Sequence, residues 1–266
     1  MASLLLSALH HSPAAHRNHY RKCATTWLGS LLVTLLVASI HGAPTMTTDR
    51  RILQGKWVNP CGLALTDGDP DGDVPQLNDS QLLSQVVIQA KTALMHAEIF
   101  RDDYINKTFR SNFAKVHNDW KANHYDWLPN KQDIPKELNE SLAKEYLDKL
   151  ELDKALLDAY EFMQTYAVGL EQIVWDQKDN NSEFQKLFAD TEYKLRTVLC
   201  ELQAALVERG VKPRPDVTRD VMVPEIRRSM NEAMTSLRDW IIFRDYMNGL
   251  EYIIEVFEHL GDRLRS

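Results

Sequence analysis

Several features that would point to a known class of protein are missing from this chain of 266 residues. It has no block of basic residues and a net charge of −7, so neither nucleic acid nor an anionic membrane surface is expected as a partner. No phosphate-cradling glycine loop and no nucleophile elbow occurs. The histidines beyond residue 43 (His96, His117, His124 and His259) lack zinc-ligand spacing. The sequence therefore predicts no enzyme and no metal or other cofactor.

The apolar run near the N-terminus is too short for a membrane span. Residues 24–40 follow a basic stretch and precede small residues at 42–43, which is the layout of a cleaved secretory signal. A membrane anchor is the alternative, but it would need about 20 apolar residues. We expect residues 1–43 to be a signal peptide and the mature chain to be secreted, without a membrane-inserted segment. Removing them takes away three cations and no anion, which moves the net charge from −7 to −10.

Cysteine is scarce, with three in the whole chain. Cys23 lies in the signal segment, which leaves Cys61 and Cys200 and a single possible pairing. In an oxidising compartment the simplest outcome is one disulfide, and the chain-entropy model gives a closure of this length about 5 kcal/mol. The alternative is two free, buried thiols in a cytosolic protein.

Four asparagines stand in the acceptor pattern for N-linked glycans. Three of them fall in expected loops or at helix ends, where a bulky polar glycan is tolerated, while the one at 106 falls within a helix and would have to face water. The four candidate glycosylation sites are Asn78, Asn106, Asn139 and Asn180.

Apolar residues at helical spacing dominate the rest of the chain. They predict helices at about 80–126, 137–177, 183–209 and 225–263, preceded by an irregular, acidic and proline-rich strap at 44–79. The expected fold is all-α, a four-helix bundle over residues 80–266. The two outer connections are long enough to cross a bundle of about 45 Å, which permits an up-up-down-down order and leaves up-down open.

Local signals refine these helices. Ser182 and Gln185 predict a capping box, and Gly210 stands where a left-handed residue would end the third helix. The apolar stripe of the first helix changes phase, which predicts a bend or break at about 105–108. In the fourth helix the apolar residues move round the axis beyond Ile241. This helix therefore either bends or is covered from two sides.

The helical blocks at 80–120, 142–175, 183–209 and 225–264 cover most of the mature chain. With one disulfide, two long outer connections and a short central turn, this layout resembles the long-chain helical cytokines, particularly the interleukin-six class and the arthropod unpaired ligands. Such cytokines share architecture and hardly any motif. The resemblance implies a monomeric ligand for a single-pass receptor with fibronectin-like modules, followed by kinase and transcription-factor signalling.

A receptor-binding patch is predicted on the first half of the fourth helix, opposite its apolar stripe. It comprises Arg228, Glu232, Asp239, Ile242 and Tyr246, because aromatic and charged residues together are typical of interface anchors. The alternative is that Ile242 and Tyr246 belong to the core once the stripe has moved round the helix.

Other interpretations remain open. Residues 67–74 copy the opening of a calcium-binding EF-hand loop, but Asn78 replaces the bidentate glutamate, and prolines disturb the loop. We therefore interpret this segment as a solvated acidic loop. An extracellular carrier of lipid or small molecules is an alternative function, and a self-associating structural component is another.

Overall fold

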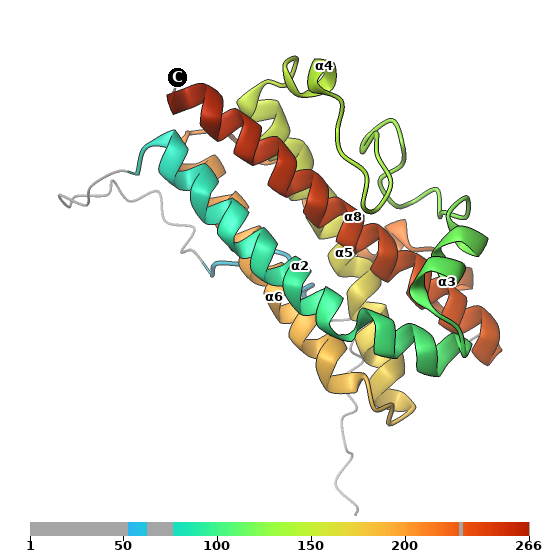
Figure 1. Cartoon of the computed structure of the whole chain (residues 1–266). Coiled ribbons are helices and arrows are strands. Elements are labelled where there is room, and N and C mark those ends of the chain that lie inside the picture. Colours follow the sequence, from blue (N-terminus) through green and yellow to red (C-terminus); the bar gives the residue numbers. More distant parts are fainter. Residues whose placement is uncertain (1–52, 63–76, 229–230, 266) are drawn as a thin grey trace, which may run out of the picture. The chain divides into compact units, whose positions relative to one another are not determined.

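The computed structural model describes residues 53–62, 77–228 and 231–265 (Figure 1). The chain divides into two units, Met1–Leu53 and Gln54–Ser266, and every labelled helix in Figure 1 belongs to the second. The predicted signal peptide (1–43) and the acidic segment at 67–74 lie outside the described residues.

The described residues are helical and contain no strand, which confirms the all-α prediction. None of the described helices is both long enough and apolar enough to cross a membrane. In chain order the elements are α2 (Asp79–Phe109), α3 (Phe113–Trp120), α4 (Lys144–Leu147), α5 (Leu152–Asp179), α6 (Gln185–Glu208), the 3-10 helix η1 (Arg219–Val221), α7 (Pro224–Arg227) and α8 (Glu232–Arg265).

The first predicted helix is divided into α2 and α3. The Asn78 side chain caps α2 by accepting a hydrogen bond from the Gln81 backbone N–H, and the Asn78 backbone N–H donates to the Gln81 side chain, so a capping box is present here. Arg110 then adopts a left-handed conformation (φ 51°), which ends the helix, and Asn112 caps α3. The predicted single helix at 80–126 is therefore wrong, and the break lies slightly beyond the expected 105–108.

The second and fourth predicted helices begin later than expected, at residues 152 and 232 instead of about 137 and 225. In the first case Asn139 is left-handed (φ 69°), and its backbone N–H donates to Glu251 of α8. The Leu142 N–H donates to Glu255 of the same helix. These backbone groups bond to α8 instead of forming helical hydrogen bonds, which explains the late start of α5.

Helix α6 runs opposite to both α2 and α5, and it packs against both. Arg209, directly after the end of α6, pairs with Asp79 at the start of α2 and with Asp153 at the start of α5. The end of α6 therefore lies beside the starts of two other helices.

Helix α8 also runs opposite to both α2 and α5, and it packs against both. Arg265 at its end donates to Ser80 Oγ at the start of α2 (3.3 Å), and Arg238 near its start pairs with Asp176 near the end of α5 (2.5 Å). Consequently α2 and α5 are parallel to each other and antiparallel to α6 and α8, as their courses in Figure 1 also show.

One continuous core joins the four long helices, and aromatic rings fill its centre. The Phe243 ring of α8 lies 5.1 Å from Phe100 of α2 and 5.2 Å from Phe188 of α6, between ring centroids. Such pairs add about 0.5–1.5 kcal/mol to the gain from burial. Most of α8 from Arg238 to Gly261 is buried without interruption of the helix, so the interpretation that it is covered from more than one side is correct.

The predicted disulfide between Cys61 and Cys200 is present (S–S 2.11 Å) and ties residues 54–62 to α6. The same segment inserts Trp57, which is 2% exposed and donates through Nε1 to the Val217 carbonyl (2.7 Å). The segment is thus anchored by a covalent bond and by a buried aromatic ring.

Close approach between α5 and α8 depends on glycine. A Cβ atom on Gly249 would lie 2.5 Å from Tyr166 Cε2, which is too short for a real contact. We expect Gly249→Ala to lower the free energy of unfolding by about 1–3 kcal/mol in urea denaturation, because the packed tyrosine must move. Gly261→Ala is the control, since nothing lies within 4 Å of its Cβ position. Equal losses in both variants would contradict this explanation.

Candidate functional site

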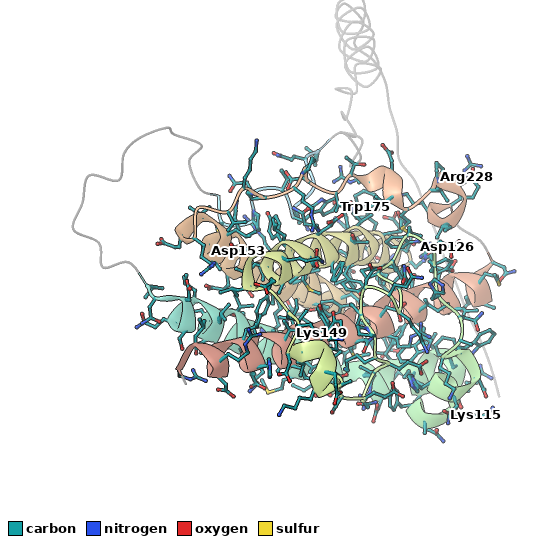
Figure 2. The ribbon with its side chains drawn as sticks, turned by 90° about the horizontal axis from the view of Figure 1, so that it is seen from above. Lys115, Asp126, Lys149, Asp153, Trp175 and Arg228 are labelled. Carbon is teal, nitrogen blue, oxygen red and sulfur yellow. A yellow bond between two sulfur atoms is a disulfide. The ribbon has the colours of Figure 1, made fainter. Side chains whose placement is uncertain are left out.

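The five residues predicted as a receptor-binding patch do not share a surface. Arg228 and Glu232 are exposed, and Figure 2 shows Arg228 at the periphery of the molecule. Asp239, Ile242 and Tyr246 are buried, each with at most 1% exposure. The predicted patch is therefore wrong for these three residues, and the core alternative holds for Ile242 and Tyr246.

Another face of α8 is covered by the chain itself, through residues 121–151, which we call the first connection. Arg244 donates to the Asn123 carbonyl (2.7 Å), and Asn248 Nδ2 donates to the Lys136 carbonyl (3.0 Å). The first connection is thus bonded to α8 through its backbone.

Two acids continue this row of contacts along α8. Glu251 accepts from the Asn139 N–H (2.9 Å) and pairs with buried Lys136, and Glu255 accepts from the Leu142 N–H (2.8 Å). Together with Arg244 and Asn248 they follow i, i+4, i+7, i+11 spacing, which places them on one face of the helix. This polar row binds the protein's own backbone and is not available to a partner.

Near the start of α8, Arg238 forms a buried ionic network. It donates to Asp239 Oδ1 (2.6 Å), to Asp176 Oδ2 (2.5 Å) and to the Ile226 carbonyl (3.2 Å). Burial raises the pKa of Asp239 to about 6, although the Arg238 charge acts in the opposite direction. These partners give Arg238 and Asp239 a role in joining α8 to α5 and to the segment before it.

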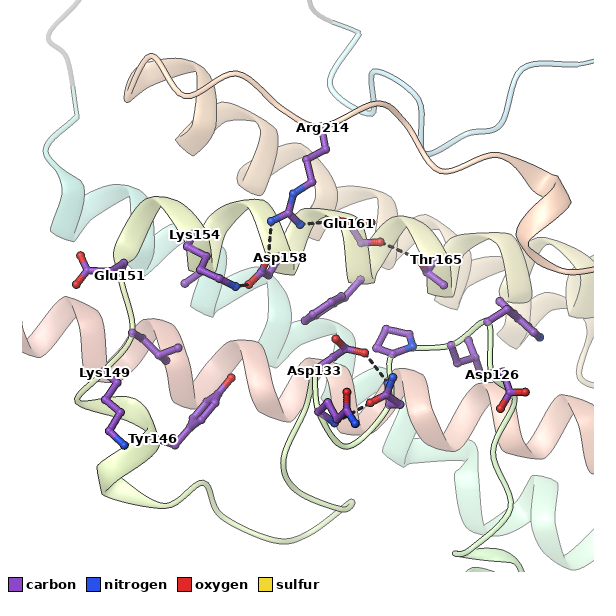
Figure 3. Close-up of a pocket in the computed structure, with 18 residues that line it drawn as sticks. Asp126, Asp133, Tyr146, Lys149, Glu151, Lys154, Asp158, Glu161, Thr165 and Arg214 are labelled. Atoms are coloured by element: carbon purple, nitrogen blue, oxygen red, sulfur yellow. Dashed lines mark hydrogen bonds and ion pairs between the residues drawn. The ribbon is translucent and has the colours of Figure 1, made fainter.

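A cavity of about 620 Å³ lies between α5 and the first connection (Figure 3). Arg214 reaches its rim and donates to Asp158 Oδ1 (2.6 Å) and Glu161 Oε2 (2.5 Å), while Lys154 also pairs with Asp158. These four charges neutralise one another, and their ion pairs hold the chain after α6 on α5.

Three exposed apolar residues on α2 form a different kind of surface. Ile88, Met95 and Ile99 are 49%, 57% and 74% exposed. At 100° per residue their spacing of seven and four places them within about 40° of each other around the helix. They form a continuous stripe, which we call the α2 stripe.

The contacts on either side of the α2 stripe show that it faces away from the core. Lys91, about 60° to one side, pairs with Glu258 of α8. His96, about 80° to the other side, contacts the Leu187 carbonyl of α6 through Nε2 (3.2 Å). Since α8 and α6 lie to the two sides, the stripe is on the outer face of α2.

Acidic side chains border the α2 stripe. Glu98, Asp102 and Asp103 are exposed on the same helix. An apolar centre with a polar rim is the usual composition of a docking surface. Sequence reasoning missed it by following only the inward stripe of α2, although the 88, 95, 99 spacing was there to be found.

All four asparagines predicted as glycan acceptors are exposed. Asn78 is the N-cap of α2, Asn106 faces solvent within α2 as expected, and Asn180 is the C-cap of α5. Asn139 lies in the first connection. Each is therefore sterically open to modification.

In the described parts of the chain, no group of three or more histidine, cysteine, aspartate or glutamate side chains is placed to hold a metal ion. Comparison with known proteins gives no further assignment: no family model matches the sequence, and neither a curated protein nor a solved structure does.

Proposed function

We propose that this protein is a secreted, cytokine-like helical ligand that binds a cell-surface receptor. The observation that carries the proposal is the parallel direction of α2 and α5, with α6 and α8 antiparallel to both. In a simple up-down bundle, each helix is antiparallel to the next helix in the sequence. Cytokine bundles run up-up-down-down instead and need two crossing connections.

The corresponding fold is an up-up-down-down four-helix bundle of α2, α5, α6 and α8. The first parallel pair, α2 and α5, is joined by residues 110–151, and the second pair, α6 and α8, is joined by residues 209–231. Helix α5 has 28 residues and a length of about 42 Å. At about 3.4 Å per residue, either of these two segments is long enough to return along a bundle of this length. Support also comes from the packing, in which α2 and α5 each contact α6 and α8.

An extracellular site of action is part of the proposal. A disulfide is compatible with an oxidising compartment, and the four exposed sequon asparagines are open to glycans. We propose that residues 1–43 direct export and that the sequons are glycosylated outside the α2 stripe. Asn106 lies on the same side of α2, about two turns beyond Ile99, so a glycan there would border the stripe.

We propose the α2 stripe as the centre of the receptor contact, with the partner a single-pass receptor with fibronectin-like modules. Exposed aliphatic side chains bordered by charges give a partner an apolar anchor and a polar rim. The charged neighbours Glu98, Asp102 and Asp103 would set orientation and association rate more than affinity.

The test is saturable binding of the purified, secreted protein to cells that each display one candidate receptor. We expect Ile99→Asp to weaken the affinity for the responding receptor about 30-fold or more, because a charge replaces an interface anchor. The far-ultraviolet circular dichroism and the melting temperature should not change, since Ile99 is 74% exposed.

Met234→Asp is the matched control, because Met234 is also an exposed apolar residue but lies at the start of α8. Its affinity should equal that of the wild type. If Ile99→Asp binds normally, or if Met234→Asp loses as much affinity, the α2 stripe is not the contact. If the wild type binds none of the displayed receptors, the receptor-ligand proposal itself fails.

A further inference from the structure

A second cavity, of about 710 Å³, lies between α3, the first connection and α8. It shares with the cavity in Figure 3 only residues of the stretch 126–132, which are Asp126, Pro129, Asn130 and Gln132. Its volume is within the range of small-molecule sites in proteins, about 300–1,000 Å³.

The floor of this cavity is apolar. Ile134 and Leu138 of the first connection and Tyr166 of α5 line it, and each is at most 5% exposed. These side chains are already fixed by the core, so they give an apolar ligand a preformed surface.

One wall of the cavity supplies a positive charge. His117, Lys121 and His124 line the cavity from α3 and the start of the first connection. Among the described residues, no carboxylate lies within ion-pair distance of Lys121, although the net charge of the chain is negative. It is therefore a cation in position to pair with a ligand.

The other charges of the cavity are compensated. Lys131 pairs with Glu137, Lys136 pairs with Glu251, and Arg244 pairs with Asp245. The remaining acid, Asp126, lies fully exposed at the rim, 3.8 Å from His124 Nε2. The uncompensated charge at the wall is thus positive.

His117 supplies an unused polar atom beside this charge. Its Nδ1 atom is buried and has no hydrogen-bond partner among the residues that the structure describes. Buried polar atoms are normally paired, so an unpaired one next to a cavity suggests a missing bonding partner. Burial lowers the pKa of His117 below its usual value, and the charges of Arg244 and Lys121 lower it further, while Glu137 and Glu140 act in the opposite direction.

We propose that this cavity binds a small amphipathic carboxylate, with the apolar body on Ile134, Leu138 and Tyr166 and the carboxylate between Lys121 and His117. Such a ligand satisfies the apolar floor, the uncompensated cation and the unpaired nitrogen together. The site goes beyond receptor docking and is independent of it, because the α2 stripe lies on a different helix.

The test is isothermal titration calorimetry of the full secreted protein with decanoate, below its micellar concentration, at pH 7. We expect saturable binding of one equivalent. Lys121→Ala and His117→Gln should each weaken it at least tenfold, since each removes one partner of the carboxylate. Lys115→Ala is the matched control: Lys115 is an exposed α3 lysine outside the cavity that pairs with Asp119 (2.7 Å), and Figure 2 shows it at the periphery.

Decanol and acetate separate the two halves of the proposed ligand. Both should bind much more weakly than decanoate, and decanoate should raise the pKa of His117 in a proton NMR titration, because a nearby anion favours the charged ring. The proposal is overturned if decanoate does not saturate, if decanol binds equally well, or if Lys121→Ala binds like Lys115→Ala. None of these results bears on receptor binding.

Discussion

Replacing both Cys61 and Cys200 by serine is expected to lower the free energy of unfolding by up to about 5 kcal/mol. The disulfide joins positions 139 residues apart, and the constraint it places on the unfolded chain grows with the length of the loop. The measurement is equilibrium urea unfolding at pH 7, in which the midpoint of the transition should fall.

Reduced wild-type protein is the control, and its transition should coincide with that of the double variant. Non-covalent contacts still hold the segment in the absence of the disulfide, since Lys56 pairs with Glu192 (2.5 Å) and Arg196 donates to the Pro60 carbonyl (3.0 Å). We therefore expect a folded but weaker protein. A loss below about 1 kcal/mol would show that the disulfide constrains little.

Arg238→Met is expected to destabilise the protein by about 3–5 kcal/mol at pH 7. The substitution leaves Asp239 buried without its cation, and removing one partner of a buried pair costs more than removing both. Chemical denaturation measures the loss. The double variant Arg238→Met/Asp239→Leu should be more stable than Arg238→Met alone, and the reverse order would contradict the pairing.

The loss of unfolding free energy in Arg238→Met should also depend on pH. Burial raises the pKa of Asp239 to about 6, above its ordinary 3.8, and removing the Arg238 charge would raise it further. From about pH 4 to above pH 6, Asp239 of the variant is therefore protonated in the folded state but ionised in the unfolded state. Because the folded state binds the extra proton, the stability of the variant rises as the pH falls. The difference from the wild type should be smaller at pH 5 than at pH 7, and a larger difference at pH 5 would contradict this.

Much of the fold could be predicted because local chemistry decides it. The predicted third helix at 183–209 agrees closely with α6 at 185–208, and Gly210 is left-handed at its end (φ 65°) as expected. The predicted capping box at Ser182 and Gln185 is not formed, however. The Ser182 hydroxyl accepts from the Phe184 N–H instead.

The errors arise where tertiary contacts override local pattern. Apolar residues such as Tyr146 and Leu150 continue the helical spacing of α5 backwards, yet the chain there bonds to α8 and includes only the four-residue α4. Arg110 carries no sequence signal for a left-handed conformation. These breaks depend on neighbours that are distant in the sequence.

The candidate site was mispredicted for the same reason. Periodicity finds one buried face of a helix, and it assigned the opposite face of α8 to solvent. In the structure Tyr246 packs against Tyr166 of α5, with ring centroids 6.3 Å apart, while Arg244 and Glu251 bind the first connection. The 88, 95, 99 spacing of the α2 stripe can be read from the sequence, but the positions of α8 and α6 on either side are needed to show that this face of α2 is the outer one.

The most direct test of the receptor-ligand proposal is to add the secreted protein to cells that each display one candidate receptor and to measure phosphorylation of the downstream transcription factor. A dose-dependent response that requires one receptor, and that Ile99→Asp loses while Met234→Asp keeps, is the predicted result. Correctly folded protein that evokes no phosphorylation through any displayed receptor would contradict it.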